Sequence, residues 1–384
     1  MIIGVPKETT PQEKRVPLIP SSVDRLVKKG AKVLVESGLG VTINLTDQDY
    51  KKVGAEISDR QTLLSSSDII LRIRKPPFEE IPSFKKNSIH ISFLDPFNER
   101  KLVEELARQH ISAISMEMIP RTTIAQKMDA LSSQANLAGY VTVILAAERM
   151  NKIFPMMMTP AGTITPARVF IIGVGVAGLQ AIATAKRLGA RVDAFDTRPV
   201  VEEQVKSLGA KFVKIDLGET GQTKDGYAKA LTPEQLEKQR QGMAKICSES
   251  DIVITTAQVF GRKAPVIVTQ DMVSQMKPGS IIIDMAVETG GNVEGSVLDQ
   301  EVNVNGVRII GLGNLPSRVA VNASQMYSAN LVSLLEHYWD KETNFFKLNL
   351  EDEILKGCLV THQGQIVNET LKKLSLPAGR QGAN

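Results

Sequence analysis

A glycine-rich turn is the part of this sequence that most clearly carries chemistry. An apolar run ending at Ile172 leads into Gly173-Val174-Gly175-Val176-Ala177-Gly178, and a helical pattern follows. In a strand–turn–helix unit, this spacing presents backbone N–H groups and a helix N-terminus to a pyrophosphate. The first glycine permits the tight turn, the second lets the backbone approach the phosphates, and the third lets helix and strand pack closely. The turn therefore predicts dinucleotide binding, and the alternative is a flavodoxin-like turn that binds nothing.

An acidic residue follows at the distance that such a site requires. Asp196 ends the next strand pattern, about twenty residues after the glycine turn. A carboxylate at this place accepts the ribose hydroxyls of an adenosine and repels a 2′-phosphate, which favours NAD over NADP. Arg198 argues in the other direction, because an arginine beside the ribose can receive a 2′-phosphate. We therefore expect NAD(H) as the ligand.

Two polar segments interrupt the apolar patterns. The first, residues 121–136, contains Arg121, Gln126, Asp129 and Ser132, and it is either a ligand-contacting loop or a polar cap on the next helix. The second, residues 216–232, is rich in glycine with a lone Tyr227, and it is either a lid or an exposed insertion.

Histidines and cysteines offer little further chemistry. Of four histidines, only His90 lies near the end of a predicted strand, where an acid/base group could act. Cys247 and Cys358 are far apart in the sequence, and neither His-x-x-His nor Glu-x-x-His spacing occurs. We therefore expect no metal site and no disulfide framework.

The elements that must hold these residues follow an alternating pattern. Short apolar runs alternate with helical patterns from Ile2 and again from Val169, which is typical of parallel, doubly wound sheets. Long helices are expected at about 133–150 and 322–339. We therefore predict an α/β fold of two Rossmann-like domains joined by long helices. The first comprises residues 1–135 plus 325–384, and the second residues 136–324.

Composition limits the class of protein. The chain has 384 residues, enough for two domains, with 42% hydrophobic residues and a net charge of +4. A balance this small gives no case for nucleic-acid binding. The longest apolar stretch, Leu137–Ala147, is closed by Glu148 and is shorter than a membrane span. Together with an N-terminus that lacks a signal-peptide pattern, these features predict a cytoplasmic protein.

Several longer stretches resemble one superfamily. They are Gly4-Val5-Pro6-Lys7-Glu8, Glu13-Lys14-Arg15-Val16, Met128–Tyr140, Phe154–Thr159, Gly173–Gly189 and Met285–Asn292. The first two resemble the opening of the alanine dehydrogenase and transhydrogenase superfamily, and the others resemble its transhydrogenase branch. Over nearly its whole length, the chain is similar to the NAD(H)-binding domain I of proton-translocating NAD(P) transhydrogenases.

The resemblance implies a reaction and a set of partners. Hydride would pass directly from NADH, held in the cleft between the two domains, to NADP⁺ on a partner (a Re/Si-specific reaction), coupled to proton translocation. The implied partners are a second copy in a homodimer, an NADP(H)-binding beta subunit and a membrane-spanning subunit. The chain would then be cytoplasmic but peripheral on the inner face of the cell membrane.

The Met-rich segment Phe154–Thr163 predicts a projecting hairpin that makes an oligomer contact.

The resemblance also assigns roles to residues. Arg121, Gln126 and Asp129 would serve the nicotinamide end, with Ser132 close by. The remaining assignments are Asp196, Thr197 and Arg198 to the adenosine, Gly226 and Tyr227 to a closing loop, and Ala257 and Gln258 to the nucleotide cleft.

Alanine dehydrogenase is the alternative enzyme. Its catalytic Lys, His and Asp correspond here to Arg74 (or the adjacent Lys75), Asp95 and Glu288, while Arg15 is retained. Hydride transfer between two nicotinamides moves no proton at the reacting carbons. A transhydrogenase therefore tolerates replacement of the catalytic Lys and His, whereas an amino-acid dehydrogenase does not. A third alternative is a non-catalytic module that senses NAD(H).

Overall fold

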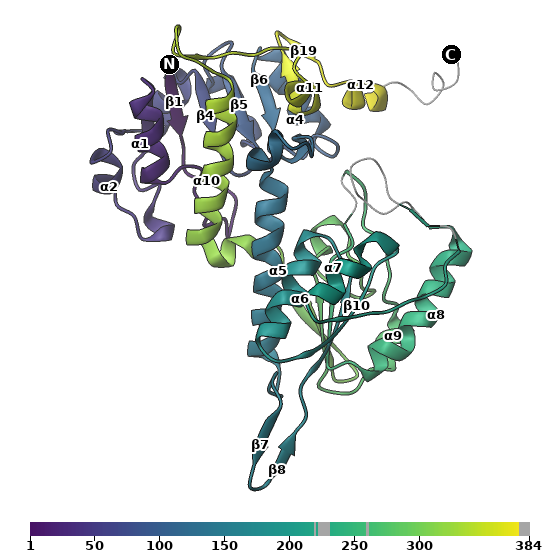
Figure 1. Ribbon diagram of the computed structural model, residues 1–384. Coiled ribbons are helices and arrows are strands. Elements are labelled where there is room, and N and C mark those ends of the chain that lie inside the picture. The colour runs from purple at the N-terminus through teal and green to yellow at the C-terminus, as the bar shows by residue number, and fades with distance from the viewer. Residues whose placement is uncertain (219, 222–230, 259–260, 376–384) are drawn as a thin grey trace, which may run out of the picture. The chain divides into compact units, whose positions relative to one another are not determined.

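Both parts of the chain are built on largely parallel β-sheets (Figure 1). The computed structural model describes residues 1–384 apart from 219, 222–230, 259–260 and 376–384. The chain divides into two compact units: unit 1 is Met1–Gln134 with Val319–Asn384, and unit 2 is Ala135–Arg318. Unit 1 is therefore discontinuous in sequence.

Unit 1 contains an eight-stranded sheet in the order β19-β18-β6-β5-β4-β1-β2-β3. Its strands are β1 (Ile2–Val5), β2 (Lys32–Glu36), β3 (Glu56–Ser58), β4 (Ile69–Leu71), β5 (Ile89–Ser92), β6 (Ser112–Ser115), β18 (Leu359–His362) and β19 (Gln365–Ile366). The pairs among β1–β6 are parallel, and the order 3-2-1-4-5-6 is that of a doubly wound fold. The edge strands β18 and β19 are antiparallel.

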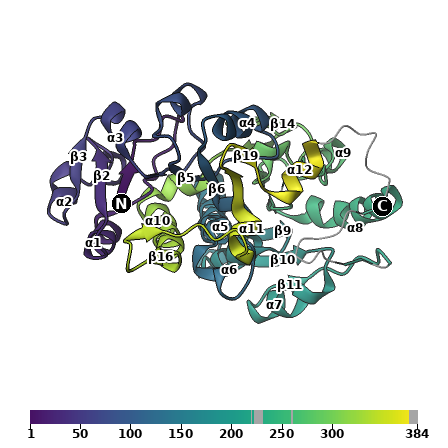
Figure 2. The same cartoon turned by 90° about the horizontal axis from the view of Figure 1, so that it is seen from above.

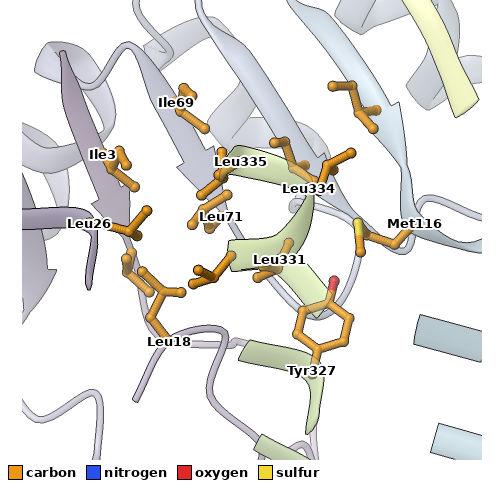
Figure 3. Packing of buried hydrophobic residues seen from close by; sticks show 14 of the residues in the cluster. Ile3, Leu18, Leu26, Ile69, Leu71, Met116, Tyr327, Leu331, Leu334 and Leu335 are labelled. Atoms are coloured by element: carbon orange, nitrogen blue, oxygen red, sulfur yellow. The ribbon is translucent and has the colours of Figure 1, made fainter. Parts of the chain in front are cut away.

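Helices cover both faces of this sheet (Figure 2). The helices of unit 1 are α1 (Pro20–Lys28), α2 (Asp47–Lys51), α3 (Arg60–Ser66), α4 (Arg100–Arg108), α10 (Ala320–His337), α11 (Glu353–Cys358) and α12 (Glu369–Ser375). Apolar residues of α1 and α10 pack on one face, and those of α3 and α4 pack on the other. Figure 3 shows Leu331 and Leu335 of α10 against Leu71 of the sheet. The return of the chain through α10 therefore completes the core of unit 1.

Unit 2 repeats this strand order over its first five positions, after which β15 precedes β14 in the sheet. Its seven-stranded sheet runs β11-β10-β9-β12-β13-β15-β14. The strands are β9 (Arg168–Ile172), β10 (Arg191–Phe195), β11 (Lys211–Phe212), β12 (Ile252–Thr255), β13 (Ile281–Asp284), β14 (Gln300–Val304) and β15 (Val307–Gly311). The helices are α6 (Val176–Arg187), α7 (Glu202–Ser207), α8 (Pro233–Glu249) and α9 (Gln270–Ser274). Only β14 is antiparallel to its neighbour among these described strands. The predicted fold class is confirmed, with antiparallel strands added at the sheet edges.

A long helix, α5 (Ala130–Arg149), crosses from the residues of unit 1 into those of unit 2. It is the one helix in the described part of the chain that is long and apolar enough to cross a membrane. Half of the most apolar stretch of this helix is buried, and the core helix of a soluble protein can be equally long and apolar. The helix is therefore weak evidence for a span.

A β-hairpin projects from unit 2 after α5 (Figure 1). Its strands are β7 (Met157–Thr159) and β8 (Gly162–Ile164), paired antiparallel. Met156, Met157 and Met158 are exposed, Met158 to 79%. The hairpin predicted for this Met-rich segment is confirmed, and its exposed methionines form an apolar surface of the kind found at protein contacts.

Candidate functional site

The glycine turn lies between β9 and the N-terminus of α6. Gly173 has a φ of 97°, and a Cβ there would lie 2.6 Å from Thr256 Oγ1. A Cβ on Gly178 would lie 2.0 Å from the Gly173 carbonyl oxygen. Both positions therefore exclude a side chain for reasons internal to the protein: the first by backbone conformation, the second by helix–strand packing.

Gly175 is different, because the protein itself does not require a glycine there. Its φ of −89° suits any residue, and no described atom outside its own neighbourhood lies within 4 Å of a Cβ built on it. The first hydrogen bond of α6 runs from Leu179 N–H to the Gly175 carbonyl (2.9 Å). The N–H groups of Val176, Ala177 and Gly178 precede that bond and belong to the unpaired first turn. Open space beside these donors fits the approach of a phosphate.

Asp196 follows β10 and binds back to the glycine turn. Its Oδ2 accepts the N–H of Val174 at 2.7 Å, and its Oδ1 accepts the N–H of Arg198 at 2.8 Å. The Arg198 guanidinium donates to both carboxylate oxygens, from Nε to Oδ1 at 2.9 Å and from Nη2 to Oδ2 at 2.8 Å. This ion pair raises the pKa of Arg198 above its ordinary value. The carboxylate expected to meet a ribose is thus engaged by its own chain.

The end of β12 closes the other side of the turn. Thr256 Oγ1 donates to the Gly173 carbonyl (2.9 Å), and Gln258 Nε2 donates to the Met285 carbonyl (2.9 Å). Thr197, next to Asp196, accepts a hydrogen bond from Thr220 Oγ1 through its carbonyl (2.7 Å). The residues after β9, β10 and β12 therefore meet at the carboxyl edge of the sheet, where the strand order reverses and doubly wound folds bind ligands.

Two buried polar residues that sequence reasoning missed hold this edge in shape. Asn292 bonds both backbone groups of Ala257, and Asp284 accepts the N–H of Asn292 (3.0 Å) and of Val293 (3.2 Å). Both side chains are fully buried. The visible signal is Asp284 itself, a carboxylate at the end of the apolar run of β13, followed by the segment Met285–Asn292.

The polar segment of unit 1 forms a short 3₁₀ helix, η4 (Ala125–Met128), just before α5. Asp129 accepts the backbone N–H of Ser132 (2.9 Å) and its hydroxyl (2.6 Å). These contacts support the start of α5, so Asp129 and Ser132 have a capping role whatever else they do. Asn330 of α10 holds the segment, donating to the Lys127 carbonyl at 2.9 Å.

Gln126 and Arg121 present exposed side chains from the same segment. The amide of Gln126 makes no hydrogen bond within the part of the chain that the structure describes. It is thus available to a ligand. The structure brings Arg121, Gln126, Asp129 and Ser132 together in unit 1 and the remaining described candidates together in unit 2. Gly226 and Tyr227 lie outside the described residues.

His90, the histidine considered for acid/base chemistry, belongs to the core of unit 1. It is fully buried, its Nε2 lies 3.0 Å from Ser92 Oγ, and its ring stacks on Phe84. Burial, together with the positive charge of Arg72, holds its pKa well below the usual value. A catalytic role for His90 is therefore wrong: the ring is neutral and enclosed.

The retained Arg15 is also engaged. Its guanidinium bonds Glu13 (2.8 and 2.6 Å) and Gln134 (2.9 Å), and Arg74 Nε donates to the same Glu13 carboxylate (3.0 Å). Although burial opposes it, hydrogen bonding and the charges of the two arginines lower the pKa of Glu13 to about 2.

Asp95, at the position of the alanine dehydrogenase His, has a left-handed backbone (φ 51°) and carries no imidazole. In the described residues, no group of three or more His, Cys, Asp or Glu side chains is placed to hold a metal ion.

Known proteins match nearly the whole length of this chain. Models described as alanine dehydrogenase/PNT, N-terminal domain, and alanine dehydrogenase/PNT, C-terminal domain, match residues 4–138 and 142–369. The first part of NAD(P) transhydrogenase subunit alpha from Rhodospirillum rubrum is 45% identical over 379 residues, covering 97% of this chain and 99% of that relative. The crystal structure of transhydrogenase from Sinorhizobium meliloti superposes with a TM-score of 0.86 at 42% identity, covering 96% of this chain and 100% of the other.

Alanine dehydrogenase is a less similar relative. The enzyme of Staphylococcus epidermidis is 31% identical over 297 residues, covering 77% of this chain and 74% of that relative. The matches confirm the resemblance to NAD(P) transhydrogenase subunit alpha and the kinship with alanine dehydrogenase. With both family models spanning nearly the whole chain, this protein belongs to the alanine dehydrogenase/PNT family.

Proposed function

We propose that this chain is the NAD(H)-binding component of a proton-translocating transhydrogenase and that unit 2 binds the nucleotide. The observation that supports this most directly is Gly175. Neither its backbone conformation nor any described neighbour calls for a glycine, yet it faces open space beside the unpaired N–H groups of α6. A ligand phosphate is the simplest reason for a glycine there.

Within this proposal, residues of the chain position the nucleotide and do not move protons. Val176, Ala177 and Gly178 bind the pyrophosphate through backbone N–H groups, and Asp196 with Thr197 and Arg198 binds the adenosine. Ala257 and Gln258 line the cleft at the end of β12. The bound nicotinamide supplies the hydride, which passes directly to NADP⁺ on an NADP(H)-binding partner subunit.

The exposed amide of Gln126 orients the nicotinamide. Arg121, Asp129 and Ser132 hold the segment from which it projects, and the Asp129 contacts to Ser132 support that role. Because no proton moves at the reacting carbons, the replacement of the alanine dehydrogenase His and Lys by Asp95 and Arg74 does not impair such a reaction. Placement of two rings in contact, away from water, is what the protein must provide.

The remaining parts of the proposal concern assembly. The exposed Met156, Met157 and Met158 of the hairpin contact a second copy in a homodimer. The chain joins a membrane-spanning subunit and an NADP(H)-binding beta subunit, whose proton translocation is coupled to the hydride step. It is then cytoplasmic, peripheral on the inner face of the cell membrane.

Reconstitution tests the proposal. The purified chain is mixed with the NADP(H)-binding partner subunit, and hydride exchange between NADH and an NADP⁺ analogue is followed spectroscopically. Exchange that requires both proteins supports the proposal. Turnover of pyruvate, ammonia and NADH by this chain alone would instead establish an alanine dehydrogenase. NADH binding without exchange, unaffected by Gln126→Ala, would indicate a sensing module.

A further inference from the structure

The carboxylate of Asp196 has no hydrogen-bonding capacity left for a ligand. Each of its two oxygens already accepts two N–H groups, and a carboxylate offers about four lone-pair sites in all. Two of these donors are backbone amides, from Val174 and Arg198. The other two belong to the Arg198 guanidinium. A ribose hydroxyl can therefore bond Asp196 only if one donor withdraws.

The guanidinium is the donor that can withdraw. The Val174 amide is part of the turn between β9 and α6, and the Arg198 amide is part of the main chain after β10. The guanidinium is carried by a flexible side chain that lies across the turn, and its Nη2 also donates to the Val174 carbonyl (3.0 Å). Only 14% of the Arg198 side chain and 6% of the Asp196 side chain are exposed. The guanidinium thus covers the edge on which a ribose would lie.

We infer that the Arg198 guanidinium is a displaceable occupant of the ribose-hydroxyl site on Asp196. By the same placement, Arg198 sets how strongly the site discriminates between NAD(H) and NADP(H). This inference rests on the proposed binding of NAD(H) to unit 2. On binding, the two adenosine ribose hydroxyls donate to Asp196 and the guanidinium moves off one or both oxygens.

Charge makes this displacement matter for specificity. A lone carboxylate excludes NADP(H) by repelling the 2′-phosphate, whereas a carboxylate paired with an arginine has no net charge. The amide of Arg198 stays bonded to Asp196, so the displaced guanidinium remains tethered beside the 2′-position. Arginine binds phosphate oxygens in a bidentate manner. Arg198 therefore weakens the discrimination that Asp196 alone would give.

The experiment measures dissociation constants on the full chain by fluorescence of the reduced nicotinamide. Wild type, Arg198→Ala and Arg198→Lys are titrated with NADH, NADPH and NADH lacking the adenosine 2′-hydroxyl. For Arg198→Ala, we expect the ratio of the NADPH constant to the NADH constant to rise at least about tenfold. Arg198→Lys, which keeps the charge without the bidentate fork, should give an intermediate ratio.

The analogue without the 2′-hydroxyl tests the displacement itself. In the wild type, the guanidinium can return to the vacated oxygen, so loss of the hydroxyl costs little affinity. In Arg198→Ala nothing returns, and the loss should be larger by at least about threefold, since a polar group left unpaired is costly. Arg191→Ala is the charge control, because it removes an exposed arginine from the opposite, amino end of β10.

Two results would overturn the inference. One is an Arg198→Ala protein that binds NADH and NADPH less tightly by the same factor, because Arg198 would then only hold the turn. The other is an unchanged penalty for the missing hydroxyl. If Arg198→Ala does not fold, as judged by thermal unfolding, Arg198→Gln takes its place in the same titrations. Failure of the wild type to bind NADH at all would contradict the proposed function instead.

Discussion

Asn292 holds the peptide groups of Ala257 from both directions. Its Nδ2 donates to the Ala257 carbonyl (2.9 Å), and its Oδ1 accepts the Ala257 N–H (3.0 Å). The same Nδ2 donates to the Pro265 carbonyl (2.9 Å). Because Ala257 follows the end of β12, this buried side chain sets the backbone path at the edge where the nucleotide is proposed to bind.

Replacing Asn292 with aspartate should therefore damage both stability and binding. The carboxylate cannot donate to the carbonyls of Ala257 and Pro265, so two partly buried acceptors lose their partner. We expect Asn292→Asp to lower the free energy of unfolding by about 3 kcal/mol and to weaken NADH binding, as measured by urea unfolding and fluorescence titration. Asn303→Asp is the control, because the exposed Asn303 side chain accepts the Gly306 N–H (3.0 Å), which an aspartate can also accept. Equal effects of the two changes would contradict the assigned role.

The glycines of the turn should separate into two classes. Gly175→Ala has space for its Cβ and an ordinary φ, so we expect an unchanged melting temperature and NADH binding weakened by at least about tenfold. Gly178→Ala would place its Cβ 2.0 Å from the Gly173 carbonyl oxygen and should lower the melting temperature by several degrees. Calorimetry and NADH titration distinguish them. A Gly175→Ala protein that binds NADH normally would remove the main support for the proposed function.

Gln126 should matter for hydride transfer and not for folding. Its side chain is exposed, and the described residues give it no hydrogen-bond partner. We expect Gln126→Ala to slow exchange with the partner subunit by about 10-fold to 100-fold while the unfolding curve stays the same. Gln48→Ala, at an exposed glutamine of α2, should leave the exchange rate unchanged. If Gln126→Ala is as active as Gln48→Ala, the amide does not position the ring.

Glu8 gives a pH dependence of stability whose sign can be stated. Burial raises the pKa of its carboxyl group from 4.5 to about 7, against the opposing charge of Arg72. The folded state keeps this proton between pH 4.5 and 7, whereas the unfolded state loses it. The contribution of Glu8 to stability is therefore greatest below pH 4.5 and declines as the pH rises to about 7.

Urea unfolding at a series of pH values measures this decline. The wild type should lose stability relative to Glu8→Gln as the pH rises from 4.5 to 7, and the difference should be constant above that range. Glu104→Gln removes an exposed carboxylate of α4 and should keep the wild-type profile. A constant difference between the wild type and Glu8→Gln across the whole range would show that the folded carboxyl group titrates normally.

The hairpin supplies a test of the proposed dimer. Met158, exposed to 79%, should be buried against the second copy, so Met158→Asp should shift the protein from dimer to monomer in analytical ultracentrifugation. The thermal unfolding of a dilute sample should change little, since the side chain has few contacts in its own chain. Val41→Asp alters an apolar residue of unit 1 that is 68% exposed and should leave the dimer intact. A Met158→Asp protein that remains dimeric would place the interface elsewhere.

Sequence reasoning reaches the fold because local patterns determine most of it. The run Val169–Ile172 is buried throughout, so its apolar character alone predicts a strand. Helix α8 escapes such reasoning because it buries few residues, although Thr232 and Gln235 form a capping box that marks its start. The antiparallel strand β18 pairs with β6, more than two hundred residues away, and no local pattern specifies such a partner.

The sequence predicts the candidate site to a similar extent. The glycines and Asp196 follow from spacing, because a phosphate-binding turn needs them in fixed places. The ion pair between Asp196 and Arg198 is not predictable, since it depends on the turn at Val174 closing over the same guanidinium. The hydrogen bonds of Asn292 to Ala257 and Pro265 require two loops to meet in space, which only the folded structure shows.

The shared strand order of the two units leads to an asymmetry. In unit 1, the loop after β1 is Pro6-Lys7-Glu8 and not a glycine turn, and Glu8 accepts the N–H of Ile73 (2.6 Å) just beyond β4. The corresponding place in unit 2 is the one proposed for a phosphate. In unit 1 this loop thus carries a carboxyl group that bonds the chain itself, and the next helix begins only at Pro20. On the proposed function, each chain therefore binds one redox ligand although its architecture contains the frame for two, because the glycine turn follows the first strand of unit 2 and not that of unit 1.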